Sequence, residues 1–215
     1  MHSQLKYAAK PLHWMKPLYW TLALTLAVLL HVPLQGFGQS TPSDTVMRLN
    51  EGLLEIMRAG AQAGFEGRYA AISPVLAETF DLAVLTRLTL GRHSRKLTEE
   101  QRAQFEALFT EMVSATYASR FNAYSGQRFE IVSQRDLKRN RKLVRTYLFT
   151  GSQKVALDYM LHLRDGRWRI VNVIAQGVSE LSLRRSEYAA IITRDGFDGL
   201  MRKIRQYVTK LASAS

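Results

Sequence analysis

The chain of 215 residues contains no cysteine, only five prolines and only five histidines. Without cysteine there is no disulfide framework, no thiolate zinc site and no cysteine nucleophile. Hydrophobic residues make up 47% and charged residues 22% of the chain, which is typical of a globular protein. This composition excludes general disorder and a protein with several membrane spans. The length fits one domain, or at most two small ones.

Motifs of the common catalytic machineries are also missing. The sequence has no P-loop, no G-x-G-x-x-G fingerprint, no G-x-S-x-G elbow and no histidine pair at metal-ligand spacing. Asp158 is the acid that most needs an explanation, because its neighbours Leu157 and Tyr159 are large and apolar. Either it is a buried general base, working with Tyr159 or Tyr147, or it lies on a solvated strand face and pairs with an arginine of a neighbouring strand. We expect the second, and we expect neither an enzyme nor a cofactor or metal.

The net charge of +12 is the feature that composition leaves unexplained, since it would attract nucleic acid and an anionic membrane surface alike. Part of it lies at the N-terminus, where three lysines precede the apolar run Tyr19–Leu30 and the small residues Gly36–Gln39. This order is typical of a secretory signal; a retained membrane anchor is the alternative. We expect residues 1–38 to be a signal peptide and residues 39–215 a single domain, which keeps nine of the twelve net positive charges.

The hydrophobic period changes along residues 39–215 from helical to strand-like and back. Helical spacing covers 43–65, 69–90 with a restart at Pro74, and 98–125, where Thr98 and Gln101 form a capping box. Strand-like runs follow at 129–133, 143–149, 155–163 and 168–174, and helical spacing returns after Gly177. The order predicts an α+β fold in which helices pack on one face of a mostly antiparallel four-stranded sheet (an NTF2-like cone), with C-terminal helices.

Basic residues are densest in one segment between two predicted strands: Arg135, Lys138, Arg139, Arg141 and Lys142, followed by Arg145. They form either a solvated hairpin turn with charged edges or a surface that docks on an anionic membrane or a partner. Nucleic-acid modules usually interleave aromatic residues with basic ones, and this segment contains none. We therefore expect no nucleic-acid partner.

Several short stretches share their order and spacing with one known family. They are Thr79–Leu82, Leu88–Gly91, Thr98–Phe105, Tyr124–Gly126, Val155–Tyr159, Gly166–Ile170, Gly177–Ser179 and Asp195–Leu200. Together they resemble the MlaC family of periplasmic lipid-binding proteins, the soluble carriers of toluene-tolerance-type ABC transport systems. The stretch Ser179–Leu181 followed by Arg184–Tyr188 is similar to the hopanoid-associated HpnM branch. Asn172 departs from the family pattern, which commonly has aspartate there. If that aspartate orients a loop by its charge, this protein must use a neutral amide instead.

The resemblance implies a periplasmic carrier without catalytic activity, which encloses lipid tails between sheet and helices. The lipid would be a phospholipid or a hopanoid. The partners would be an inner-membrane ABC transporter complex with an MCE-type protein and an outer-membrane lipoprotein complex. The residues that we expect to line the tail cavity are Phe80, Leu85, Leu88, Tyr117, Phe121, Tyr147, Leu157, Tyr159, Leu161, Trp168, Ile170 and Val178.

Two other functions remain open at this point. One is an envelope adaptor that binds anionic lipid headgroups through the basic segment 135–145 without enclosing tails. The other is a small α+β enzyme that uses Asp158.

Overall fold

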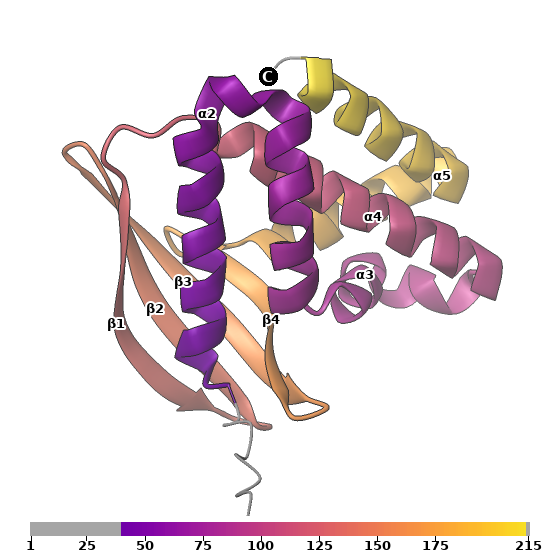
Figure 1. Ribbon diagram of the computed structural model, residues 1–215. Coiled ribbons are helices and arrows are strands. Elements are labelled where there is room, and N and C mark those ends of the chain that lie inside the picture. The colour runs from indigo at the N-terminus through magenta and orange to yellow at the C-terminus, as the bar shows by residue number, and fades with distance from the viewer. Residues whose placement is uncertain (1–39, 214–215) are drawn as a thin grey trace, which may run out of the picture. The chain divides into compact units, whose positions relative to one another are not determined.

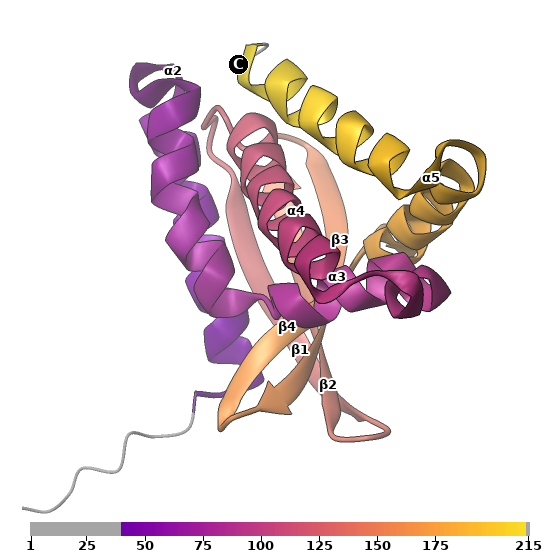
Figure 2. The ribbon, with the colours of Figure 1, turned by 90° about the vertical axis from the view of Figure 1, so that its right-hand side faces the viewer.

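The structure, a computed structural model, describes residues 40–213 and has helices at both ends of a continuous series of strands. The elements are α2 Pro42–Thr79, α3 Leu82–Leu90, the 3₁₀ helix η1 Gly91–Lys96, α4 Glu99–Arg120, β1 Arg128–Leu137, β2 Arg141–Thr150, β3 Gln153–Arg164, β4 Arg167–Ala175, β5 Val178–Ser179 and α5 Glu180–Ser213. Figures 1 and 2 show α2 and α4 side by side over the sheet. The predicted α+β fold is therefore confirmed. The predicted signal peptide, residues 1–38, lies outside the described residues.

The sheet has five strands in the order β1-β2-β3-β4-β5, each antiparallel to its neighbours, instead of the four that we predicted. The additional strand, β5, has only two residues and pairs Ser179 with Ile174. Gln176 and Gly177 both have positive φ, which folds the chain back tightly onto β4. Two residues are too few to show an alternating pattern, so the sequence could not reveal this strand.

Alternation along β2 and β3 separates the two faces of the sheet. On the inner face, Val144 pairs with Tyr159, and both side chains are buried in the core. On the outer face, Arg145 pairs with Asp158. The inner face carries the residues that meet the helices, so the site must be sought there.

The predicted restart of the second helical stretch, 69–90, at Pro74 is wrong. Pro74 lies inside α2, and the chain turns instead at Gly60 and Gly64, whose φ angles are 50° and 61°. Figure 1 shows the result as two antiparallel halves of α2. Arg68, only 2% exposed, donates hydrogen bonds to the carbonyl oxygens of Gly60 (2.7 Å) and Ala118 (2.9 Å), which holds the turn against the end of α4. Burial of the residues around Pro74 outweighs the cost of a proline within a helix, about 3 kcal/mol.

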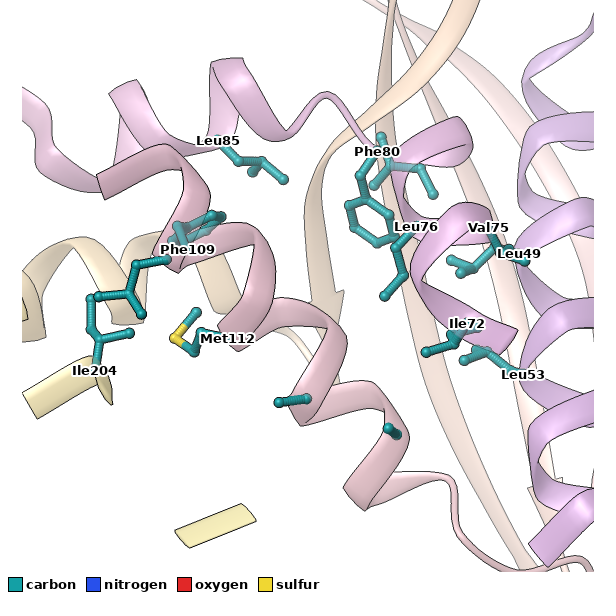
Figure 3. Close-up of a cluster of buried hydrophobic side chains, with 14 of the residues drawn as sticks. Leu49, Leu53, Ile72, Val75, Leu76, Phe80, Leu85, Phe109, Met112 and Ile204 are labelled. Carbon is teal, nitrogen blue, oxygen red and sulfur yellow. The ribbon is translucent and has the colours of Figure 1, made fainter. Parts of the chain in front are cut away.

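The other helix predictions agree more closely with the structure. Thr98 and Gln101 form the predicted capping box at the start of α4. The C-terminal helical region is one element, α5, bent at Gly196, where φ is 71°. The kink lets both halves of α5 contact the rest of the fold, as Figure 2 shows. The buried core combines residues of α2, α4 and the inner sheet face, and Figure 3 shows part of it.

Candidate functional site

An apolar cavity of about 170 Å³ lies between the helices and the inner face of β3 and β4. It is lined from α2 to α5 by Leu53, Phe80, Leu85, Thr89, Phe109, Met112, Val113, Thr116, Tyr117, Arg120, Phe121, Leu157, Tyr159, Asn172, Val173, Ala175, Glu180, Leu181 and Arg184. Figure 3 shows Leu85 of α3 pointing toward Phe80 at the end of α2. Most of these side chains are aliphatic or aromatic, so the cavity offers an apolar ligand a surface that water solvates poorly.

Aromatic rings form a continuous part of the wall. Tyr117 stacks on Phe121 with ring centroids 5.7 Å apart and meets Phe80 edge-on at 5.9 Å. Burial raises the pKa of Tyr117 and also that of Tyr159. Both phenols therefore stay neutral at any physiological pH, and the aromatic wall carries no charge.

The corner between α2 and α3 is fixed to the sheet by Asp81. Its backbone N–H donates to the carbonyl of Ile170 in β4 (3.0 Å), and its side chain caps α3 by accepting from Val84 N–H. The carboxylate also lies 2.8 Å from His162 Nε2 and 3.2 Å from Arg164 Nη1. Burial by itself raises the pKa of Asp81, but these hydrogen bonds and the charge of Arg164 outweigh it and hold the pKa below its ordinary value. The carboxylate thus stays ionised and keeps Phe80 and Leu85 at the cavity.

The other side of the cavity is fixed by Asn172, the residue that departs from the family pattern. Its Oδ1 accepts hydrogen bonds from the Ser179 hydroxyl (3.1 Å) and from Leu181 N–H (3.3 Å). The Ser179 oxygen in turn accepts from Ser182 N–H and caps the start of α5. A neutral amide oxygen therefore holds β5 and the first turn of α5, because two N–H or O–H donors need only an acceptor and no charge.

Charged residues gather at one end of the cavity. Arg120 ends α4, Glu180 begins α5 and Arg184 follows one turn later. The apolar wall and this charged end together make the cavity amphipathic. A ligand with an apolar part and a polar group at one end matches this arrangement.

Six of the twelve predicted tail-lining residues surround this cavity: Phe80, Leu85, Tyr117, Phe121, Leu157 and Tyr159. The other six lie outside it: Leu88, Tyr147, Leu161, Trp168, Ile170 and Val178. Leu161 and Ile170 are fully buried in the core, and Trp168 packs partly buried against it.

Three of the residues outside the cavity face away from it altogether. Leu88 and Val178 are 38% and 55% exposed. Tyr147 lies on the outer face of the sheet, where the ammonium of Lys154 sits 3.6 Å from its ring centroid. The structure thus places these three predicted residues away from the cavity. An apolar residue in a strand or helix can face the core, the cavity or solvent, and local sequence does not say which.

The sequence analysis missed Arg120, Glu180 and Arg184, which come from segments about 60 residues apart. It also missed Met112, Val113 and Thr116. A signal was available for Val113 alone, because it lies one helical turn before Tyr117, which was already a candidate, and residues one turn apart share a face.

Asp158 pairs with a strand neighbour, as expected. Its two carboxylate oxygens accept from Nε and Nη2 of Arg145, both at 2.7 Å, on the outer face of the sheet. It is therefore on the opposite side of the sheet from the cavity. Nothing in this geometry brings it together with Tyr159, which faces inward.

The basic segment forms a hairpin turn, with Lys138–Asn140 between β1 and β2. Lys142 is engaged by Asp136 and lies over the ring of Trp168, and Arg141 contacts the sulfur of Met160. Arg135, Lys138 and Arg139 are exposed and, within residues 40–213, have no carboxylate within 4.0 Å. These last three form what we call the basic hairpin.

Metal clusters and membrane-spanning helices are both absent from residues 40–213. No group of three or more His, Cys, Asp or Glu side chains there is placed to hold a metal ion. None of the described helices combines the length and the hydropathy needed to cross a membrane.

Known proteins that resemble this chain in sequence and in structure include lipid-binding and lipid-transport proteins. The chain is 26% identical over 122 residues to the intermembrane phospholipid transport system binding protein MlaC of Haemophilus influenzae, a match that spans 54% of this chain and only 57% of that protein. It is 25% identical over 179 residues to the toluene tolerance protein ttg2D of Pseudomonas putida, covering 80% and 83% of the two chains.

Among solved structures, a phospholipid-binding protein from Ralstonia solanacearum, solved in complex with a phospholipid, has the same fold. The TM-score is 0.72 at 19% identity, covering 80% of this chain and 99% of the other. The family model of MlaC proteins matches residues 48–206, about three quarters of the sequence. The chain therefore belongs to the MlaC family.

Proposed function

We propose that this protein is a periplasmic lipid carrier. Its apolar cavity of about 170 Å³ widens between helices and sheet to enclose phospholipid tails, and the protein shuttles the lipid between the inner and outer membranes. The observation that carries the proposal is the cavity between sheet and helices, with its uncharged aromatic wall and its charged end. The names of its relatives, a phospholipid transport binding protein and a phospholipid-binding protein, agree with this ligand class.

The physical task explains why the wall is apolar and unspecific. A lipid with two acyl chains, about 30 methylenes, costs about 24 kcal/mol to expose to water, at roughly 0.8 kcal/mol per methylene. A carrier must offset that cost, yet it must also release the lipid to a membrane. A wall of Phe, Tyr, Leu and Val side chains offers the chains about what the bilayer interior offers, so uptake and release are balanced.

Location and partners follow from the proposed role. Residues 1–38 would act as the export signal, and the mature chain would work in the periplasm. An inner-membrane ABC transporter complex with an MCE-type protein would sit at one end of the route and an outer-membrane lipoprotein complex at the other. Because the sequence also resembles the HpnM branch, a hopanoid is the alternative ligand.

The proposal predicts that the protein carries lipid when purified. After expression with its N-terminal segment and purification without detergent, organic extraction and mass spectrometry should recover phospholipid in a fixed molar ratio to protein. Delipidated protein should take up phospholipid again from vesicles. A protein that is free of lipid and also fails to take it up would contradict the proposal. Recovery of a hopanoid alone would mean that the ligand is a hopanoid and not a phospholipid.

The basic hairpin supports a second role within the same function, docking on anionic membranes. We expect the triple variant Arg135→Gln, Lys138→Gln, Arg139→Gln to bind phosphatidylglycerol vesicles about 100-fold more weakly, since each basic residue near the surface contributes about 1 kcal/mol. The readout is vesicle co-sedimentation at low and high salt.

The matched control is Arg92→Gln, Arg95→Gln, Arg205→Gln, which removes the same charge from other exposed positions. Equal losses in the two triple variants would show that net charge alone attracts the protein. An adaptor that binds headgroups without enclosing tails would show the vesicle effect but no bound lipid.

A further inference from the structure

A second cavity, of about 500 Å³, adjoins the apolar one between α4 and the two halves of α5. Four residues line both cavities: Met112, Arg120, Glu180 and Arg184. Figure 3 shows Met112 on α4 on the side of Ile204 in α5, and Ile204 lines the second cavity. The two spaces therefore meet at the charged end of the apolar cavity.

The second cavity differs from the first in polarity. Three cationic side chains (Arg120, Arg184, Lys203) and two acidic ones (Glu180, Glu187) line it, which leaves one net positive charge at neutral pH. A group that carries a single negative charge is its electrostatic complement.

The two shared arginines are free of carboxylate partners. Among residues 40–213, neither Arg120 nor Arg184 has an acidic oxygen within 4.0 Å, whereas Arg145 and Arg164 on the sheet each hold an aspartate. Arg184 contacts the sulfur of Met112 (3.5 Å) and both the ring face (5.9 Å) and the hydroxyl of Tyr188, none of which carries a charge at neutral pH. A guanidinium has five N–H donors, so both side chains keep strong donors for an anion.

We infer that Arg120 and Arg184 bind the phosphate of a phosphodiester lipid headgroup, with the acyl chains in the apolar cavity and the remainder of the headgroup in the second cavity. This inference rests on the proposed function and sharpens it. Two guanidinium groups at the junction match the planar, bidentate way in which arginine binds phosphate oxygens. They also sit where the headgroup must emerge if the chains lie against Tyr117 and Leu157.

The consequence is selection for phosphate-bearing lipids. A neutral lipid, such as a diacylglycerol or a polycyclic alcohol, would place no anion between the two guanidinium groups and would gain only the apolar contacts. The site thus favours a phospholipid over a hopanoid, a choice that the sequence resemblance left open.

The test is a competition between two lipids with identical chains. Delipidated protein is incubated with vesicles that contain equal amounts of a phosphatidylglycerol and the matching diacylglycerol, then separated and extracted for mass spectrometry. We expect the wild type to retain phosphatidylglycerol about tenfold or more over diacylglycerol. The variant Arg120→Gln, Arg184→Gln should retain both lipids in nearly the vesicle ratio, because the apolar cavity is intact. The matched control Arg95→Gln, Arg205→Gln loses the same charge outside both cavities and should keep the wild-type ratio.

The other possible outcomes contradict either the phosphate site or the carrier function. Equal uptake of both lipids by the wild type, or an unchanged ratio in the Arg120/Arg184 variant, overturns the phosphate site and leaves the carrier function standing. A wild type that takes up neither lipid overturns the carrier function itself. Calorimetry with inorganic phosphate alone should detect no binding, and tight saturable binding would mean a free-phosphate site instead of a headgroup site.

Discussion

Replacing Leu157 with glutamate is expected to abolish lipid uptake while the protein stays folded. Leu157 lies on β3 with its side chain partly buried at the cavity wall. Without ligand, a carboxylate there is hydrated by water in the cavity, so folding tolerates it. With ligand, acyl chains must displace that water, and the cost of dehydrating the charge weakens binding by at least about 100-fold. The measurement is the lipid retained by delipidated protein after incubation with phospholipid vesicles.

The matched control for this variant is the adjacent residue. Ala156 pairs with Tyr147 on the outer face of the sheet, so Ala156→Glu adds the same charge on the same strand but outside the cavity. It should leave lipid uptake unchanged. If both variants, or neither, lose lipid while their circular dichroism spectra match the wild type, the cavity described here is not where the tails bind.

The second large effect concerns stability, at Asp81. Asp81→Ala should lower the free energy of unfolding by about 3 kcal/mol, because it removes the cap of α3 and the anionic partner of His162 and Arg164. The expected loss of stability is no larger than this because His162 and Arg164 are both partly exposed, so water can rehydrate them once the carboxylate is gone. Asp81→Asn should lose about half as much, since an amide oxygen still caps the helix. Urea denaturation at neutral pH measures both.

Acid should remove the same contribution from the wild type. The folded state holds the pKa of Asp81 below the ordinary value of 3.8, so the unfolded chain binds a proton at this residue more readily. The contribution is therefore fully present above that value and is lost as the pH falls below it, through the lower pKa of the folded state. Asp81→Asn has no such group and should show a correspondingly shallower loss of stability in acid.

A nearby exposed acid supplies the control for Asp81. Asp165 is 88% exposed and lies 3.5 Å from the same Arg164. Asp165→Asn should change the free energy of unfolding very little, because an exposed ion pair contributes little to stability. A loss as large as that of Asp81→Asn would mean that the charge of Arg164, and not the buried corner at α3, controls stability.

Local patterns predicted most of the secondary structure because they depend on neighbours in the chain. The capping box at Thr98 and the change of period at the strands needed no information from elsewhere in the fold. The pairing of Asp158 with an arginine of a neighbouring strand was also predictable, because opposite charges on one face of a sheet pair across strands and β2 carries two arginines, Arg141 and Arg145. The same local reasoning failed at Pro74, where burial of distant contacts kept the helix intact.

From the sequence, the presence of an apolar cavity between sheet and helices was predictable, but most of the residues that line it were not. Phe80, Tyr117 and Leu157 were identified through a family resemblance, and six of the twelve residues predicted in this way lie outside the cavity. Whether an apolar side chain faces the cavity, the core or solvent depends on register and on the tilt of each element. In β2, for example, Tyr147 and Val144 differ by three positions and so lie on opposite faces.

By itself, the sequence determined the α+β order of elements, the absence of thiol chemistry and of common catalytic motifs, and the family motifs in their order. Only the tertiary structure decided which residues enclose the cavity and that Arg120 and Arg184 both line it and the adjoining one without a carboxylate partner among residues 40–213. The physical reason is distance along the chain. Helical and strand periods act over a few residues, whereas a cavity and its charges depend on packing between segments dozens of residues apart.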